Sequence, residues 1–253
     1  MQVSQTATRW RRVRLFLLGL LLLILLASAG FVIWALWVPA PMSEAIAALQ
    51  SDAQVTVTTD AWLVFQPLNG APTTGFIFYP GGRVDARAYA PAAHAIAAAG
   101  HLVVIVPMPL NLAVLGVDRA EQVVAAYPQI KRWAIGGHSL GGAMAATYVD
   151  NHADQMAALI FWAAYPAANN SLADRNNLAV TSIYGTLDGL ATLEKVDASR
   201  PLLPTTTTWV PIEGGNHAQF GWYGPQAGDN EATITRSEQQ QQVIEATLAA
   251  LDD

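Results

Sequence analysis

No cysteine occurs in the 253 residues of this chain. Without a thiol, the protein cannot form a disulfide, use a thiolate nucleophile or build a metal site from cysteine ligands. Charged residues are also scarce, at 13% of the sequence, whereas 53% of the residues are hydrophobic. A chain of this composition is not intrinsically disordered and can fill a sizeable core.

Basic residues are scarce outside the first 14 positions. Four of the thirteen Lys and Arg residues precede a long apolar stretch, and all nineteen acidic residues follow it. The remainder of the chain therefore has nine basic against nineteen acidic residues, a formal charge of −10. Phosphate binding depends on Lys and Arg, so we expect neither nucleic acid nor anionic lipid to be a partner of this part.

An uncharged stretch of 24 residues runs from Leu15 to Val38. A helix of that length is about 36 Å long and can cross a bilayer with some tilt. Arginines precede it at positions 9, 11, 12 and 14, so the positive-inside rule places the N-terminus in the cytoplasm. We predict that residues 1–40 form a cytoplasmic stub with a single-pass anchor, and that residues 41–253 form one extracytoplasmic domain.

The apolar stretch has an alternative interpretation as a signal peptide. Residues 15–26 form an apolar region of suitable length, and Ala27-Ser28-Ala29 resembles a cleavage site. We favour the uncleaved anchor because residues 31–38 continue the apolar run beyond that site. Cleavage after Ala29 would give a secreted protein, so both interpretations export the domain.

Beyond the apolar stretch, β-rich segments alternate with helical patterns. The expected strands span residues 55–59, 62–65, 76–79, 102–106, 133–135, 158–162, 180–184 and 207–212, and the expected helices span 86–99, 117–126, 141–151 and 237–251. Runs such as LVVIV lack polar alternation, which is typical of a parallel sheet covered on both faces. The first two segments are more polar, so we expect them to pair antiparallel.

The sequence WAIGGHSLGGAM at 133–144 contains the pattern G-x-S-x-G around Ser139. The pattern follows a predicted strand and opens a predicted helix, as a nucleophile elbow requires. Glycines at 137 and 141 leave room where a Cβ would meet the adjacent strand and helix. We therefore predict that Ser139 is a nucleophile and not merely a helix N-cap. His138 is expected to pack inside the turn instead of acting as a second base.

A serine hydroxyl needs a base to take its proton, and the base needs an acid to fix its tautomer. Asp188 and His217 each follow a predicted strand, in the chain order serine, acid, base. Loops at the carboxyl ends of parallel strands meet at one crevice, so these residues can converge. Glu194 and Asp197 are alternatives for the acid, but they fall inside or beyond the next helix.

An oxyanion formed at Ser139 needs two N–H donors. The N–H of Leu140, just after the nucleophile, is expected to be one of them. The loop at residues 80–83, which reads PGGR, can supply the other because paired glycines let the backbone turn inward. We select Gly82, with Arg83 as the second choice.

Together these motifs resemble the α/β-hydrolase superfamily, in particular its compact branch of dienelactone hydrolases and other small esterases. The resemblance covers residues 55–251 and rests on YPGG at 79–82, GHSLGG at 137–142, YGTLDG at 184–189 and GGNHAQFG at 214–221. It implies an α/β-hydrolase fold with a mostly parallel sheet of about eight strands and helices on both faces. It also implies ester hydrolysis by Ser139, His217 and Asp188, with no cofactor and no metal.

Two departures from the family limit what the resemblance says of the substrate. The oxyanion loop reads PGG where many members have His-Gly, and Ser139 stands where dienelactone hydrolases carry cysteine, so their substrate is not carried over. The connection between residues 162 and 180 is too short for a lid domain, which disfavours an interfacially activated lipase. Aromatic residues expected at the active face fit either the core or the wall of a modest apolar pocket, namely Trp162, Tyr165, Phe220, Trp222 and Tyr223.

The sequence therefore predicts a serine hydrolase that cleaves an ester or related acyl bond of a small molecule through an acyl-enzyme. Thioesterase, peptidase and acyltransferase chemistry remain open because fold and triad do not set the substrate. The alternative from another class of protein function is a membrane-tethered, non-catalytic binding module on a hydrolase scaffold. The oligomeric state is not predicted, and the lipid bilayer is expected as a partner through Leu15 to Val38.

Overall fold

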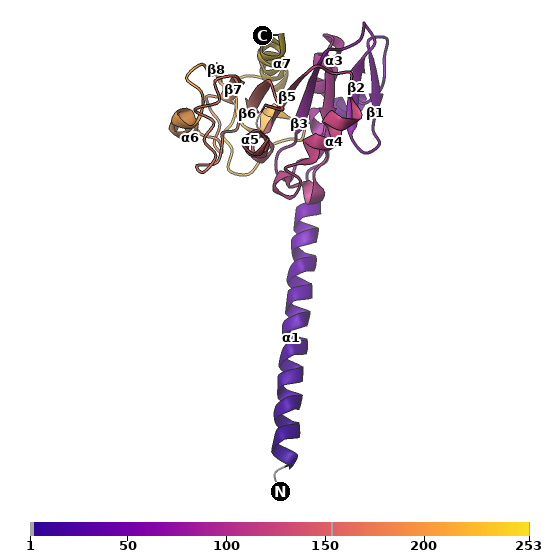
Figure 1. The fold of residues 1–253 in the computed structure, drawn as a ribbon, viewed down its shortest axis with the longest axis vertical. Helices are drawn as coiled ribbons and strands as arrows, with labels where there is room; N and C mark the ends of the chain where they lie inside the picture. The colour runs from indigo at the N-terminus through magenta and orange to yellow at the C-terminus, as the bar shows by residue number, and fades with distance from the viewer. Residues whose placement is uncertain (1–2, 153, 253) are drawn as a thin grey trace. The chain divides into compact units, whose positions relative to one another are not determined.

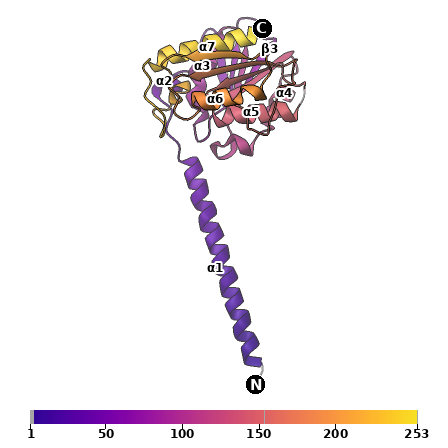
Figure 2. The ribbon, with the colours of Figure 1, turned by 90° about the vertical axis from the view of Figure 1, so that its left-hand side faces the viewer.

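The computed structural model describes residues 3–152 and 154–252, which form two units. The first unit, up to Val38, is the helix α1 (Val3–Leu36), drawn in indigo in Figures 1 and 2. Its segment Arg9–Leu36 is long and apolar enough to cross a membrane. A signal sequence meets the same criteria of length and composition.

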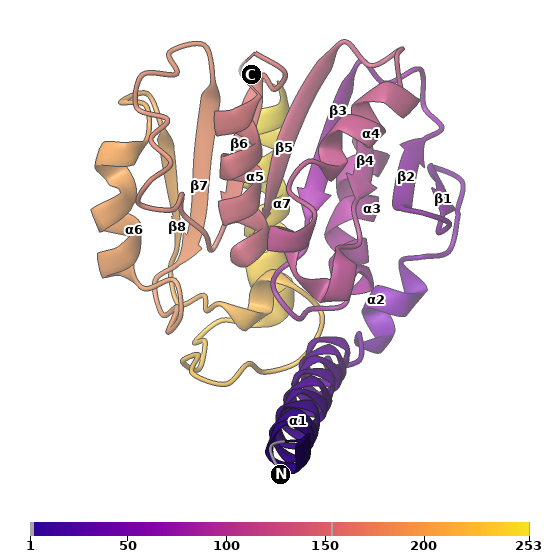
Figure 3. The ribbon, with the colours of Figure 1, turned by 60° about the horizontal axis from the view of Figure 1, so that its bottom comes forward.

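The second unit, from Pro39 onward, is built around one sheet of eight strands in the order β1-β2-β4-β3-β5-β6-β7-β8 (Figure 3). These strands are β1 (Val55–Thr58), β2 (Leu63–Pro67), β3 (Thr74–Tyr79), β4 (Leu102–Ile105), β5 (Arg132–His138), β6 (Ala158–Trp162), β7 (Ala179–Gly185) and β8 (Thr208–Ile212). Strands β3 to β8 pair in parallel, whereas β1 and β2 pair antiparallel with their neighbours. The predicted strands and the antiparallel start of the sheet are confirmed.

Helices cover both faces of this sheet. One face carries α3 (Ala90–Ala98) and α7 (Arg236–Asp252), and the other carries α4 (Arg119–Ala126) and α5 (Leu140–Asn151) (Figure 3). Successive side chains of a strand point to opposite faces, so Phe76 and Ile77 of β3 enter two separate core clusters. Burial on both faces explains why the central strands lack polar alternation.

Two further helices are short. The helix α2 (Ser43–Ala47) precedes the sheet, and α6 (Leu193–Ser199) follows β7. The expected helix at 86–99 is instead a 3₁₀ turn, η1 (Ala86–Tyr89), that leads into α3. Asp85 caps this turn by accepting a hydrogen bond from the Arg87 N–H at 2.9 Å. A proline lies in the first turn of α3, where its missing N–H costs no hydrogen bond within the helix.

The strand order places several loops together at one edge of the sheet. The chain leaves β3 to form β4 on one side, and β5 lies against β3 on the other side. Tyr79 pairs with Gly137 at the ends of β3 and β5, and Trp162 of β6 pairs with His138. Ligands of open α/β sheets bind at such a switch point, outside the carboxyl ends of the strands.

Candidate active site

Ser139 lies in the turn between β5 and α5, and its backbone has φ 52° and ψ −122°. A residue with a side chain costs about 1–3 kcal/mol in such a conformation unless its surroundings impose it. Here the Ser139 N–H donates to the Trp162 carbonyl at 3.0 Å, and the Ser139 carbonyl accepts from the Ala143 N–H at 3.1 Å. The strand and the helix therefore hold the turn from both sides, as in a nucleophile elbow.

Gly141 shows how closely the first turn of α5 approaches β3. A Cβ at this position would collide with the carbonyl oxygens of Tyr79 and Pro80. The end of β3 therefore runs directly against the helix that follows Ser139. This contact places the loop at residues 80–83 beside the predicted nucleophile.

His217 and Asp188 form a buried hydrogen-bonded pair. The distance from His217 Nδ1 to Asp188 Oδ2 is 2.8 Å, and the two residues are only 1% and 4% exposed. The second oxygen, Asp188 Oδ1, accepts from the N–H groups of Leu190 and Ala191, both at 2.7 Å. These contacts fix the carboxylate, which as a pure acceptor puts the imidazole proton on Nδ1 and leaves the Nε2 lone pair free to take a proton.

Ser139 and His217 line the same cavity, which has a volume of about 300 Å³. The other lining residues are mostly small or apolar, namely Leu140, Ala143, Ala163, Ala164, Tyr165, Leu190 and Ala191. His217 Nε2 has no hydrogen-bond partner among the described residues, Ser139 included. In serine hydrolases the contact between base and hydroxyl often tightens only when substrate binds.

The loop at 80–83 leaves one N–H group available. The Gly81 N–H donates to Tyr89 Oη at 3.0 Å, and the Arg83 N–H donates to the Asn111 carbonyl at 2.8 Å. Within the described part of the chain, no group accepts the Gly82 N–H. A Cβ at Gly82 would lie 3.0 Å from Leu140 Cδ2, so Gly82 faces the residue after Ser139. This pattern favours Gly82 over Arg83 as the second oxyanion donor.

The aromatic residues divide between core and pocket. Tyr165 lines the cavity, whereas Trp162, Phe220 and Tyr223 are buried in the core cluster beneath α3 and α7. Trp162 also donates from Nε1 to Thr247 of α7 at 3.0 Å. The walls of the cavity are therefore mainly alanine and leucine side chains.

Asp229 is a residue of the site that the sequence analysis did not identify. Its Oδ1 accepts from the N–H groups of Gly189 at 3.1 Å and His217 at 3.2 Å, and its Oδ2 accepts from Ala218 at 2.8 Å. It thereby joins the loop of Asp188 to the loop of His217. No motif marks it, because its partners are backbone groups of two distant loops.

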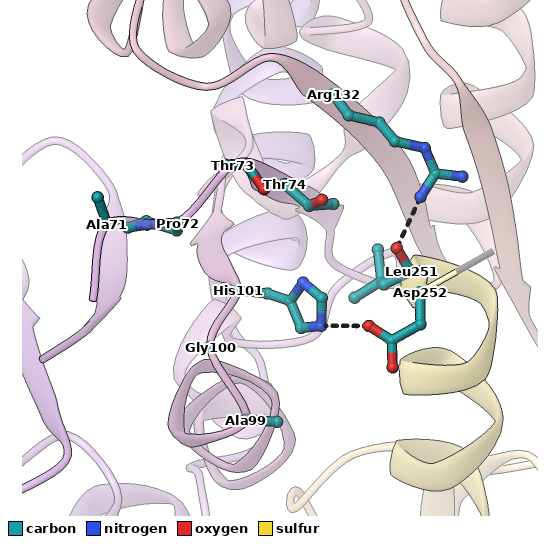
Figure 4. Close-up of a pocket in the computed structure, with 10 residues that line it drawn as sticks. All are labelled: Ala71, Pro72, Thr73, Thr74, Ala99, Gly100, His101, Arg132, Leu251 and Asp252. Atoms are coloured by element: carbon teal, nitrogen blue, oxygen red, sulfur yellow. Dashed lines mark hydrogen bonds and ion pairs between the residues drawn. The ribbon is translucent and has the colours of Figure 1, made fainter. Parts of the chain in front are cut away.

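No group of three His, Asp or Glu side chains in the described part of the chain could hold a metal ion. Another pocket, of about 370 Å³, lies at the opposite edge of the sheet, where β3, β4 and β5 begin (Figure 4). Two of its side chains contact the end of α7: His101 Nε2 lies 3.3 Å from Asp252 Oδ1, and Arg132 Nη1 donates to the Leu251 carbonyl at 2.6 Å. These side chains hold the end of the C-terminal helix, and neither Ser139 nor His217 lines this pocket.

A comparison with known protein families identifies the family of this chain. Residues 75–241 match the family model described as the Alpha/beta hydrolase family. The chain belongs to the alpha/beta hydrolase family. The matched residues run from β3 into α7 and include Ser139, Asp188 and His217, so the family resemblance predicted from the motifs is confirmed.

Solved structures share the fold of this alpha/beta hydrolase at low sequence identity. The esterase domain of a Rhodothermus marinus protein has a TM-score of 0.56 and 10% identity, covering 75% of this chain and 91% of that one. A butyrate-bound esterase from Thermogutta terrifontis has a TM-score of 0.55 and 14% identity, covering 77% and 91%. A Klebsiella pneumoniae protein assigned as a dienelactone hydrolase has a TM-score of 0.55 and 16% identity, covering 80% and 98%. A search of curated proteins finds no match.

Proposed function

We propose that this alpha/beta hydrolase is a serine esterase that uses Ser139 as nucleophile, His217 as base and Asp188 as acid. The observation that carries the proposal is the buried His217–Asp188 pair, whose imidazole shares a cavity with a serine held in an elbow turn. A structural histidine does not need a buried carboxylate that fixes its tautomer next to a strained serine. A non-catalytic binding module would not require this combination.

The proposed reaction follows from the roles of these groups. His217 Nε2 takes the proton of Ser139 as Oγ attacks the ester carbonyl, and Asp188 stabilises the imidazolium that forms. The N–H groups of Leu140 and Gly82 hold the oxyanion. His217 then gives its proton to the leaving alcohol, and a water activated by the same imidazole releases the acid from the acyl-enzyme.

The substrate is proposed to be an ester with a short, apolar acyl group. The cavity of about 300 Å³ is lined chiefly by alanine and leucine, so it favours a small hydrocarbon group over a charged or long one. The Thermogutta terrifontis esterase has been solved with butyrate bound and, separately, phosphorylated by paraoxon. These states of a protein with the same fold support short acyl esters and organophosphates as probes.

We further propose that residues 1–40 anchor the enzyme in the membrane and that residues 41–253 act outside the cytoplasm. The apolar helix and the arginines on its N-terminal side support this orientation. Cleavage after Ala29 would release the same domain. The orientation is therefore independent of whether the helix stays attached.

Hydrolysis of p-nitrophenyl esters from acetate to palmitate tests this function. We expect turnover that is fastest for acetate and butyrate, and a loss of at least about 10³-fold in Ser139→Ala. Ser171→Ala, which changes an exposed loop serine in the same way, should keep wild-type rates. A folded wild-type protein that hydrolyses none of these esters, nor a matched thioester or p-nitroanilide, would favour the binding module.

A further inference from the structure

A buried pair of polar side chains, Tyr89 and His138, lies between the proposed oxyanion loop and the proposed base. Tyr89 Oη is 2.8 Å from His138 Nδ1 and accepts the Gly81 N–H at 3.0 Å. The ring centroids of His138 and His217 are 4.4 Å apart. Both members of the pair are essentially inaccessible to solvent, at 2% and 0% exposed. The mechanism described above uses neither of them.

The direction of one of these hydrogen bonds is fixed by its chemistry. An amide N–H can only donate, so the Tyr89 oxygen accepts from Gly81. In the described part of the chain, His138 Nδ1 is the acceptor within reach of the Tyr89 hydroxyl, so we assign the hydroxyl proton to that bond. With this assignment the imidazole of His138 is neutral and carries its single proton on Nε2, which has no hydrogen-bond partner among the described residues. Burial next to His217 lowers the pKa of His138 well below its ordinary value, which agrees with the neutral form.

This pair determines which amide of the loop can reach the substrate. Tyr89 occupies the Gly81 N–H, and the Asn111 carbonyl occupies the Arg83 N–H, so the Gly82 N–H between them is left over. The fit is tight: a Cβ at Gly81 would lie 2.7 Å from His138 Nδ1 and 2.9 Å from Tyr89 Oη. His138 in turn is the last residue of β5 and directly precedes Ser139.

We propose that Tyr89 and His138 are positioning residues that hold the loop at 80–83 in register with Ser139, so that the Gly82 N–H points at the developing oxyanion. The proposal rests on the serine esterase function and adds a hydrogen-bonded connection between the oxyanion loop and the nucleophile turn. The connection also keeps a neutral ring beside His217. A cation there would oppose the imidazolium that His217 forms during the reaction.

Tyr89→Phe is the variant that tests the proposal. It keeps the buried ring but removes both the acceptor for the Gly81 N–H and the donor to His138. Tyr148→Phe is the matched control, because Tyr148 is equally buried and its hydroxyl donates to Gln155 at 2.6 Å, outside the cavity. Each full-length variant is compared with wild type for thermal unfolding and for kcat and KM on p-nitrophenyl butyrate.

The decisive readout replaces the carbonyl oxygen of the substrate by sulfur. An oxyanion hole is built for oxygen, so an ordered hole favours the ester over the matched thionoester. For Tyr89→Phe we expect kcat on the ester to fall about 10- to 100-fold with little change in KM, and the preference for ester over thionoester to fall by a similar factor. Tyr148→Phe should keep both the rate and the preference.

Two results would overturn the positioning role while wild type remains active. One is a Tyr89→Phe enzyme whose rate and preference stay within about twofold of wild type. The other is an equal loss on both substrates, which would mark a general structural defect. If Tyr89→Phe does not fold, His138→Gln provides the same comparison. A wild-type protein inert toward both substrates would instead refute the esterase function, and this inference with it.

Discussion

At the level of single residues, distance favours Asp188 as the proposed acid. Asp188 Oδ2 lies 2.8 Å from His217 Nδ1 and is buried, whereas Glu194 and Asp197 are exposed on α6. Asp197 is also paired with Arg200 at 2.8 Å. The alternatives that the sequence left open for the acid are therefore not supported by the geometry.

Replacing Asp188 by asparagine should impair catalysis much more than folding. An amide in place of the carboxylate favours the wrong tautomer of His217, so we expect kcat to fall about 10³- to 10⁴-fold with KM nearly unchanged. Steady-state hydrolysis of p-nitrophenyl butyrate measures this loss. Glu194→Gln is the control and should keep wild-type activity. If Glu194→Gln is the inactive variant and Asp188→Asn is active, the assignment of the acid is wrong.

His138 should make the stability of the folded domain depend on pH. Because burial lowers its pKa in the folded state, the unfolded chain binds a proton below about pH 6.5 that the folded chain does not. The contribution of neutral His138 to the free energy of unfolding is therefore fully present above that pH, and it falls as the solution becomes more acidic. His101, whose pKa is also lowered by burial, acts in the same direction.

Urea unfolding between pH 5 and pH 7.5 isolates the contribution of His138. The slope of the unfolding free energy against pH should be smaller in His138→Gln than in wild type. The difference is at most the contribution of one proton, about 1.4 kcal/mol per pH unit where the curve is steepest. The comparison concerns the slope and not the absolute stability, which the substitution also lowers. An unchanged slope in the variant would contradict a buried, neutral His138.

The residues of the site differ in how far the sequence could indicate them. Ser139 was predictable because its turn requires glycines at fixed spacing, and Asp188 and His217 because each follows a predicted strand. Tyr89 and Asp229 were not predictable. They act on backbone N–H groups of other loops, and a backbone contact leaves no residue type at the partner position to recognise.

At the level of elements, the sheet could be predicted because its central strands are buried on both faces. A run of apolar residues bounded by turn residues marks such a strand clearly. The segment at 86–99 was harder, since η1 and α3 share the same apolar periodicity and differ only in hydrogen-bond pattern. The loops after β7 and β8 are held together by the Asp229 carboxylate, which lies outside both strands. This contact could not be predicted from the strand pattern and was found only in the structure.

The Asp229 contact suggests a test of how these two loops are held together. Asp229→Asn retains one oxygen acceptor but places an NH₂ group against backbone N–H donors of the loops. We expect a stability loss of about 1–3 kcal/mol and a fall in kcat that exceeds any change in KM. Chemical denaturation and ester hydrolysis measure the two effects.

Glu231→Gln makes a similar change two residues away on an exposed side chain, and it serves as the control. It should leave both stability and kcat at wild-type values. An Asp229→Asn enzyme that matches this control in both measurements would show that the loops hold their position without the carboxylate.

At the level of the whole molecule, the chain combines a catalytic unit with an apolar helix. The unit from Pro39 onward has core clusters on both faces of its sheet, so it has the means to fold by itself. A chain starting at Pro39 should be recovered in the soluble fraction and hydrolyse p-nitrophenyl butyrate with kcat/KM within about twofold of the full-length enzyme.

The full-length chain should instead remain with the membrane fraction after carbonate extraction. Sequencing the N-terminus of the membrane-bound protein then distinguishes an anchor from a signal peptide. An intact N-terminus supports the anchor, whereas a start at Gly30 would show cleavage. Full-length protein found only in the soluble fraction, with its N-terminus intact, would contradict a membrane role for the helix.

The most direct test of the account is covalent labelling with a fluorophosphonate probe, which reports whether Ser139 is activated. We expect one phosphonylated residue, Ser139, identified by mass spectrometry of the full-length protein, and loss of labelling in the folded His217→Ala variant. Folded wild-type protein that never reacts, or a label that forms equally without His217, would contradict a base-activated serine at the edge of this sheet.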